Sequence, residues 1–120
     1  MTQSLEDYLE AVSFLDDEGA VRVTDIARRL GVSKPSVIGA LRQLEGQGLV
    51  THERYGTVFL TGPGRRRAAL IRERHSMLTA FLRDVLGVSG EVAEADACRM
   101  EHCLSGETLE RMRALVSGKS

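Results

Sequence analysis

Two short amphipathic segments joined by Gly31-Val32-Ser33 constrain the fold of this chain more than any other feature. Asp25–Leu30 is expected to form a first helix, with Thr24 as its N-cap and the glycine as its stop signal. The serine caps a second helix, and Pro35 lies in the first turn, where its missing N–H costs nothing. The apolar stripe expected on the second helix consists of Val37, Leu41 and Leu44. This pattern predicts two helices joined by a tight turn, which is typical of a helix-turn-helix.

A hairpin pattern follows directly. Leu49–Glu53 and Thr57–Leu60 are predicted to be short strands hinged at Tyr55-Gly56, and a hairpin after a helix-turn-helix is typical of a winged helix. Thr61-Gly62-Pro63-Gly64 is expected to break the chain. Helices are expected over residues 4–16, 65–86, 91–104 and 106–116. We therefore predict a mainly α protein, with a winged helix-turn-helix domain at residues 1–64 and a helical domain at residues 65–120.

Charged residues are unevenly distributed along the chain. The formal net charge is −1, but residues 1–20 carry six acidic side chains and no basic one. Residues 21–75 carry eleven basic and four acidic side chains, and residues 76–120 carry five basic and seven acidic ones. The near-neutral total hides a basic middle that contains the expected helix-turn-helix and hairpin, as a nucleic-acid-binding face requires.

Membrane and secreted classes are disfavoured. No apolar run approaches the roughly 20 residues that a bilayer span requires, and the acidic N-terminus does not resemble a signal peptide. Cys98 and Cys103 would lie about 140° apart around a helix, which is poor geometry for a disulfide. A reducing cytoplasm, with no membrane partner, is therefore the expected location.

The start of the second expected helix offers groups that suit double-stranded DNA. A recognition helix enters the major groove by its N-terminal end, where hydroxyls, N–H groups and a lysine contact phosphates. Gly39 lies at a groove-facing position, so we expect DNA shape to contribute to specificity. Arg65-Arg66-Arg67 is either a further phosphate contact or a solvated face. The predicted DNA-binding residues are Ser33, Lys34, Pro35 and Ser36, together with Arg54 and Tyr55 at the hairpin tip.

Two carboxylates near the N-terminus and one histidine are ambiguous by themselves. Asp7 and Glu10 are three residues apart, so they share a helix face opposite the apolar stripe, as solvated carboxylates also would. His75 lies four residues after Ile71 and three before Leu78, where a core histidine is the ordinary interpretation. Complementary ligand types elsewhere in the chain favour a metal role for His75.

Those complementary ligands lie in the expected helix over residues 91–104. Cys98, Glu101 and His102 have i, i+3, i+4 spacing, so they converge on the side away from that helix's apolar face. A thiol, a carboxylate and an imidazole together are typical ligands of a transition metal. Cys103 falls on the apolar side and is expected to be a buried thiol.

Three stretches of the sequence resemble the diphtheria-toxin-repressor and manganese-transport-regulator family. They are Leu5-Glu6-Asp7-Tyr8-Leu9-Glu10, His75 and Cys98-Arg99-Met100-Glu101-His102-Cys103-Leu104-Ser105, and the resemblance extends over nearly the whole chain. It implies a homodimer in which winged helices are joined to a helical dimerisation domain, with divalent metal between them switching on binding to operator DNA. By position, the implied metal ligands are Asp7, Glu10, His75, Cys98, Glu101 and His102. Because the sequence stops near residue 120, no SH3-like third domain is expected.

The sequence departs from both main branches of that family. Asp7 and Glu10 are similar to the manganese branch, whereas Cys98 stands where the iron branch has cysteine and the manganese branch has glutamate. Thr79, one turn after His75, supplies no carboxylate for a second, ancillary site. Mn²⁺ or Fe²⁺ is therefore the expected cofactor. The sulfur ligand also allows Zn²⁺ or Co²⁺ as alternatives. The sequence leaves open whether each subunit binds one ion or two.

The predicted function is metal-responsive transcriptional regulation, and the resemblance implies repression, which is the usual activity in that family. Without metal, the carboxylates of Asp7, Glu10 and Glu101 would repel one another. Bound metal would remove this repulsion and fix the spacing of the two recognition helices in the dimer. Metal binding would thereby be coupled to DNA binding. One alternative is a winged-helix regulator that responds to an organic ligand, and another is a zinc-responsive member of the family. A metalloenzyme is disfavoured, because no separate general base or oxyanion site is evident.

Overall fold

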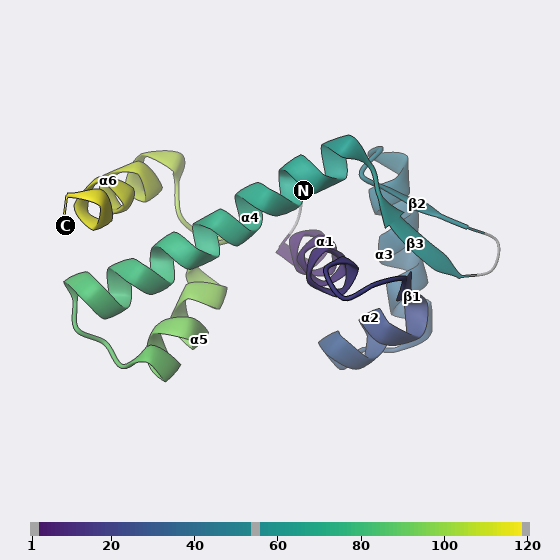
Figure 1. Cartoon of the computed structure of the whole chain (residues 1–120), viewed down its shortest axis with the longest axis horizontal. Helices are drawn as coiled ribbons and strands as arrows, with labels where there is room; N and C mark the ends of the chain where they lie inside the picture. Colours follow the sequence, from purple (N-terminus) through teal and green to yellow (C-terminus); the bar gives the residue numbers. More distant parts are fainter. Residues whose placement is uncertain (1–2, 54–55, 119–120) are drawn as a thin grey trace. The chain divides into compact units, whose positions relative to one another are not determined.

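The computed structural model describes residues 3–53 and 56–118 (Figure 1). The chain separates into two compact units, Met1–Ala69 and Leu70–Ser120. None of the helices in the described ranges is both long and apolar enough to cross a bilayer.

The element order confirms the predicted mainly helical architecture. The first unit contains α1 (Gln3–Asp16), β1 (Val21–Arg22), α2 (Val23–Leu30), α3 (Lys34–Gly46), β2 (Val50–His52) and β3 (Thr57–Leu60). The boundary between the units falls within α4 (Gly62–Ala80), which is followed by the π-helical turn η1 (Phe81–Val85), α5 (Gly90–Met100) and α6 (Gly106–Ser117).

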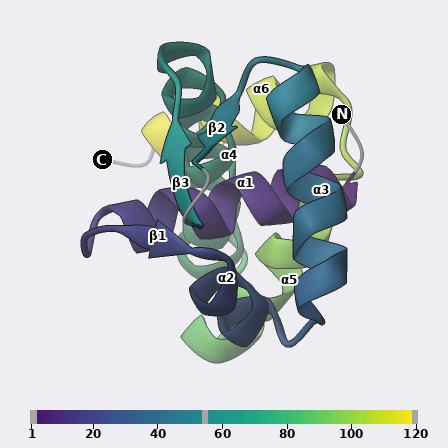
Figure 2. The same cartoon turned by 90° about the vertical axis from the view of Figure 1, so that its right-hand side faces the viewer.

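The first unit is a winged helix-turn-helix. Helices α1, α2 and α3 pack against one another, and a three-stranded antiparallel sheet lies beside α1 and α3 (Figure 2). Gly31 ends α2 in a left-handed conformation at φ 67°, and the Ser33 hydroxyl caps α3 by accepting the Ser36 N–H at 3.3 Å. The expected stripe of α3 is buried in this core. The sequence-based prediction of the two helices and their turn is thus confirmed.

A third strand was absent from the prediction. Strand β1 pairs with β3 through Val21↔Val58 and Arg22↔Thr57, which gives the sheet order β1-β3-β2. Two residues are too short for an alternating pattern to be recognised in sequence. The strand also moves the start of α2: Arg22 is the N-cap and donates its N–H to Asp25 at 3.1 Å, so the prediction of Thr24 as the cap was wrong.

The expected chain break at Thr61-Gly62-Pro63-Gly64 was wrong, because α4 begins there. The Thr61 hydroxyl accepts the Gly64 N–H at 3.0 Å, and the proline in the first turn has no N–H to lose. At Gly64 the helix backbone lies so close to the residue that precedes β2 that a Cβ atom would be 1.9 Å from the Leu49 carbonyl oxygen. Here glycine permits a close approach of two backbone segments instead of ending a helix.

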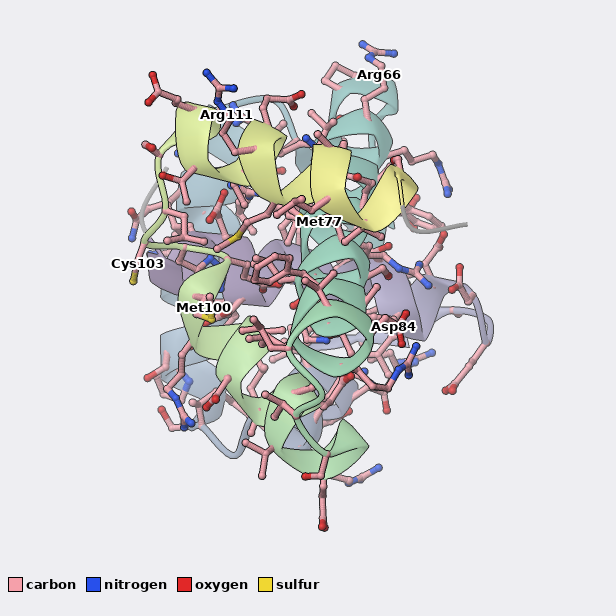
Figure 3. The ribbon with its side chains drawn as sticks, turned by 90° about the vertical axis from the view of Figure 1, so that its left-hand side faces the viewer. Arg66, Met77, Asp84, Met100, Cys103 and Arg111 are labelled. Carbon is pink, nitrogen blue, oxygen red and sulfur yellow. The ribbon has the colours of Figure 1, made fainter. Side chains whose placement is uncertain are left out.

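The second unit has its own apolar core. Its buried members are Met77, Leu78, Leu82, Ala93, Ala97 and Leu109, of which Figure 3 labels Met77. Met112 and Val116 of α6 pack against this cluster. Arg113 of α6 donates from Nη2 to Glu73 of α4 at 2.8 Å, and this hydrogen bond raises the pKa of Arg113 above its ordinary value. Packing within the unit therefore accounts for the burial of Leu109 and for the partial burial of Met112 and Val116.

The predicted helix over residues 91–104 ends early. Helix α5 stops at Met100, and a turn follows in which the Cys103 N–H donates to the Met100 carbonyl at 3.0 Å. Cys103 is exposed, and Figure 3 shows its thiol pointing away from the ribbon. The expectation of a buried thiol was wrong, because it continued the helical periodicity three residues past the end of the helix.

Candidate metal centre and nucleic-acid interface

A buried carboxylate lies at the end of α5. Glu101 is fully buried, although glutamate is among the residue types least often found inside a protein without a partner. Its backbone N–H donates to the Ala97 carbonyl at 3.0 Å, which keeps Glu101 on the last turn of the helix. Such a charge requires compensation nearby.

Two imidazoles provide contacts for the two oxygens of that carboxylate. His75 of α4 places Nδ1 at 3.0 Å from Oε2 of Glu101, and His102 places Nε2 at 3.1 Å from Oε1. The side chains of His75 and His102 are 17% and 1% exposed. Helix α4 and the turn after α5 thus bring together three of the predicted ligands within the second unit.

The donor set of this cluster suits a divalent transition metal. An imidazole lone pair repels an ionised carboxylate oxygen, so each nitrogen–oxygen contact requires either a proton or a cation between the two atoms. Carboxylate oxygen and imidazole nitrogen are common ligands of manganese, iron and zinc. The residues present therefore fit the metal that the sequence predicted.

The two N-terminal carboxylates lie on α1 in the first unit. Asp7 and Glu10 are half-buried, and their spacing of three residues places them on one face of the helix. Asp7 also borders a depression of about 190 Å³ that is lined by Tyr8, Leu30 and Val32. The role of Asp7 and Glu10 as metal ligands stays a prediction.

Cys98 and Cys103 are both exposed, and neither forms a disulfide, as expected from their spacing. Cys98 lies on α5 three residues before Glu101, and its role as a metal ligand stays a prediction. The Cys103 thiol donates to the Arg99 carbonyl at 3.5 Å, which places it on the turn and outside the His75–Glu101–His102 cluster.

Glu94 is a residue that the sequence-based reasoning missed. Its Oε1 lies 2.6 Å from Nε2 of His75, on the other nitrogen of the ring from Glu101. The sequence spacing could have indicated Glu94, because it lies seven residues before Glu101 and residues seven apart share a face of a helix. Thr79, which supplies no carboxylate, instead donates its hydroxyl to the His75 carbonyl at 2.9 Å.

The predicted DNA-contacting residues of α3 are all at the surface. Ser33, Lys34, Pro35 and Ser36 are exposed at the start of the helix, and Gly39 is exposed with open space around it. Arg54 and Tyr55 fall outside the described residues. Arg65 forms an ion pair with Asp16 at 2.9 Å, so one member of the arginine run is already engaged within the first unit.

These features define a class of protein. A winged helix with an exposed, capped recognition helix, joined to a helical unit with a buried carboxylate–imidazole cluster, defines a metal-dependent DNA-binding regulator. Family comparisons lead to the same class. The family model described as the iron dependent repressor N-terminal DNA-binding domain matches residues 1–58, and that of the metal binding and dimerisation domain matches residues 61–118. The chain belongs to the iron-dependent repressor family.

Individual relatives are similar over most of this chain. The transcriptional regulator MntR of Escherichia coli O6:H1 is 46% identical over 110 residues, which cover 91% of this chain and 70% of the relative. The HTH-type transcriptional regulator MntR of Geobacillus kaustophilus is 36% identical, with 96% and 82% covered. A solved manganese-dependent transcriptional repressor in complex with manganese superposes with a TM-score of 0.85 at 32% identity. That comparison covers 94% of this chain but 52% of the solved one, so this chain spans about half of its length.

The comparisons confirm the predicted function class. The chain is a metal-dependent transcriptional regulator with a DNA-binding domain and a metal-binding and dimerisation domain, and its cofactor is a divalent transition metal. The prediction that it is not an enzyme agrees with its relatives, which are transcriptional regulators. The prediction of a cytoplasmic location stays a prediction.

Proposed function

We propose that this chain is a metal-activated repressor that binds operator DNA as a homodimer when Mn²⁺ or Fe²⁺ is bound. The observation that carries the proposal is the fully buried Glu101, which has an imidazole on each of its oxygens. The proposed ligand set is Asp7, Glu10, His75, Cys98, Glu101 and His102.

The choice of ion follows from the ligand types. Hard carboxylate oxygens supply three of the six proposed ligands and suit manganese and iron, and one similar solved structure is that of a manganese-dependent transcriptional repressor in complex with manganese. The sulfur of Cys98 adds a soft ligand, which raises the affinity for Fe²⁺, Co²⁺ and Zn²⁺. A zinc-responsive member of the family is the outcome expected if Cys98 contributes strongly.

The ligands act by their charge. Asp7, Glu10 and Glu101 contribute three carboxylates to one proposed centre, and their mutual repulsion opposes a compact arrangement. A bound divalent ion supplies the positive charge that offsets this repulsion. Two imidazoles on Glu101 orient its oxygens, so little reorganisation of the second unit is required when the ion binds.

DNA recognition is assigned to the start of α3. The helix N-terminus and the Ser33 and Ser36 hydroxyls suit phosphate oxygens, and Lys34 adds a positive charge. We place Arg54 and Tyr55 at the wing on the sequence pattern alone. Because Gly39 offers no side chain to a base, specificity is expected to depend on DNA shape as well as on direct contacts.

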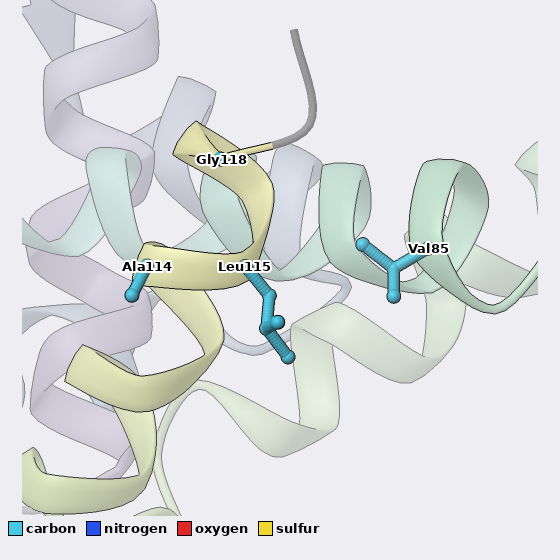
Figure 4. A pocket seen from close by; sticks show the side chains of 4 residues that line it. All are labelled: Val85, Ala114, Leu115 and Gly118. Atoms are coloured by element: carbon cyan, nitrogen blue, oxygen red, sulfur yellow. The ribbon is translucent and has the colours of Figure 1, made fainter.

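The homodimer is assigned to the second unit. An apolar pocket of about 390 Å³ is lined by Val85 of η1, by Ala114 and Leu115 of α6, and by Gly118, which directly follows α6 (Figure 4). Leu115 is 57% exposed, although it is a large apolar side chain. An exposed apolar surface on a domain of the dimerisation type is the surface that a second copy would cover.

The test of the proposed function is a titration of operator DNA at several metal concentrations. Fluorescence anisotropy under anaerobic conditions should show tight binding only with Mn²⁺, Fe²⁺ or another activating ion, and the apparent DNA affinity should rise about 5- to 150-fold with metal. Thermodynamic reciprocity requires that DNA raise the metal affinity by the same factor. Equal DNA affinity in the absence and presence of every ion would contradict the proposal.

Replacement of Lys34 by Ala tests the placement of the DNA-binding face. The loss of one phosphate contact per protomer, and so of two per dimer, should weaken binding to all sequences similarly and reduce the slope of log affinity against log salt by about two. Arg111→Ala is the matched control, because this exposed residue of α6 carries the same charge in the other unit. An unchanged salt slope for Lys34→Ala, or an equal loss for Arg111→Ala, would place the interface elsewhere.

A further inference from the structure

His75 has a carboxylate on each ring nitrogen. Nδ1 lies 3.0 Å from Oε2 of Glu101, and Nε2 lies 2.6 Å from Oε1 of Glu94. The two carboxylates have very different surroundings, because the side chain of Glu101 is 0% exposed and that of Glu94 is 64% exposed. The ring therefore connects a buried group on one side to a solvated group on the other.

We propose that Glu94 is a positioning residue of the metal centre. It accepts the Nε2–H of His75 and thereby leaves Nδ1, the nitrogen that faces Glu101, as the atom that binds the ion. The inference rests on the proposed function, since it assigns a role to His75 as a ligand.

The chemistry of imidazole supports this division of roles. A neutral ring carries one N–H donor and one lone pair, and the hydrogen bond made by one nitrogen decides which nitrogen is available for metal. Histidines that bind metals commonly donate their other N–H to a carboxylate, which fixes the ring and increases its basicity as a ligand. Glu94 and Glu101 occupy these two positions around His75.

The helices make the arrangement rigid. Glu94 and Glu101 lie about two turns apart on one side of α5, and His75 reaches both from α4. A half-turn of the ring about χ2 would replace both nitrogens by carbons at these positions, so both contacts would be lost together. Glu94 thus stabilises the single ring orientation in which Nδ1 faces the buried carboxylate.

The exposure of Glu94 argues for positioning and against ligation of the same ion. The two nitrogens point away from each other across the ring, so an ion beside Nδ1 and Glu101 is on the far side from Glu94. A solvated carboxylate holds a hydrogen bond at little desolvation cost. Glu94 consequently acts on the centre through His75.

The first test is spectroscopic and uses the whole chain. Long-range proton–nitrogen correlation spectra of the ¹⁵N-labelled protein, with and without diamagnetic Zn²⁺, report the state of each imidazole nitrogen. In the zinc-bound protein, His75 should retain its proton on Nε2 and show Nδ1 as the ligating atom. A spectrum in which Nε2 binds the ion would overturn the proposal.

The second test compares metal affinities by Mn²⁺ titration. Glu94→Ala should weaken binding about 10- to 100-fold, the range found when such carboxylates are removed. Glu94→Gln should recover most of the loss, because its amide oxygen still accepts the Nε2–H although the charge is gone. Glu91→Ala, which removes an exposed carboxylate from the same helix, should leave the affinity unchanged. Equal losses in Glu94→Gln and Glu94→Ala would mean that charge alone matters, and would overturn the proposal.

A double-mutant cycle shows whether Glu94 acts through His75. In a His75→Ala background, with folding checked by circular dichroism, Glu94→Ala should have no further effect on metal affinity. A loss that persists there would mean that Glu94 is itself a ligand. If the wild-type chain takes up no divalent ion, the proposed function fails together with this inference. If it takes up the ion but Glu94→Ala binds as tightly as wild type, this inference fails alone.

Discussion

A chain with Gln in place of Glu101 is expected to lose metal-dependent DNA binding. The amide keeps the volume of the side chain but removes the negative charge and one acceptor oxygen from a site that is fully buried. Both imidazoles that contact Glu101, at 3.0 Å and 3.1 Å, lose their anionic partner. We expect metal affinity to fall by more than the roughly 100-fold that loss of an outer carboxylate produces.

The measurement combines isothermal titration with Mn²⁺ and anisotropy on operator DNA. At a metal concentration that just saturates the wild type, Glu101→Gln should bind DNA with the affinity of the metal-free wild type. Glu107→Gln is the matched control, since Glu107 is an exposed carboxylate in the first turn of α6. Wild-type metal affinity in Glu101→Gln would show that the buried cluster is a structural hydrogen-bond network.

Substitution of Gly64 by Ala is expected to destabilise the first unit strongly. The added Cβ would lie 1.9 Å from the Leu49 carbonyl oxygen and 2.9 Å from its carbonyl carbon, and both are backbone atoms that cannot rotate away. The start of α4 would have to shift, which weakens the hydrogen bond from the Gly64 N–H to Thr61. Overpacking of this kind costs about 1–3 kcal/mol, and we expect a value at the upper end of that range.

Urea unfolding of the two variants Gly64→Ala and Gly62→Ala measures this effect. Gly62 lies in the same turn, but a Cβ there has only the end of the Arg66 side chain within reach, at 3.5 Å. Gly62→Ala should therefore change the free energy of unfolding by less than about 1 kcal/mol. Similar free energies for both variants would contradict the close approach at Gly64.

Most helices could be predicted because their signals are local. The Gly31 stop, the Ser33 cap and the period of the apolar residues place α2 and α3 within one or two residues of the observed bounds. The last helix was predicted over residues 106–116 and is observed as Gly106–Ser117. These features depend on neighbours within one or two turns, so a single sequence reveals them.

The incorrect sequence-based predictions, in contrast, concern features that depend on residues distant in the chain or on where an element ends. Strand β1 exists because Val21 pairs with Val58, a residue far along the chain. The start of α4 depends on Gly64 accepting the close approach of Leu49, although glycine and proline locally signal a break. Cys103 is exposed because α5 ends at Met100. In each case a contact or an element end that local patterns do not encode decided the outcome.

The candidate site shows the same division. The sequence alone determined the existence of the helices, the Ser33 cap and a ligand motif that identifies the family, because these depend on spacing along the chain. Only the tertiary structure decided that Glu101 is fully buried with His75 and His102 on its two oxygens, and that Glu94 holds the other nitrogen of His75. The physical reason is that burial and hydrogen-bond partners depend on which helices pack together, and α4 and α5 meet only in the folded chain.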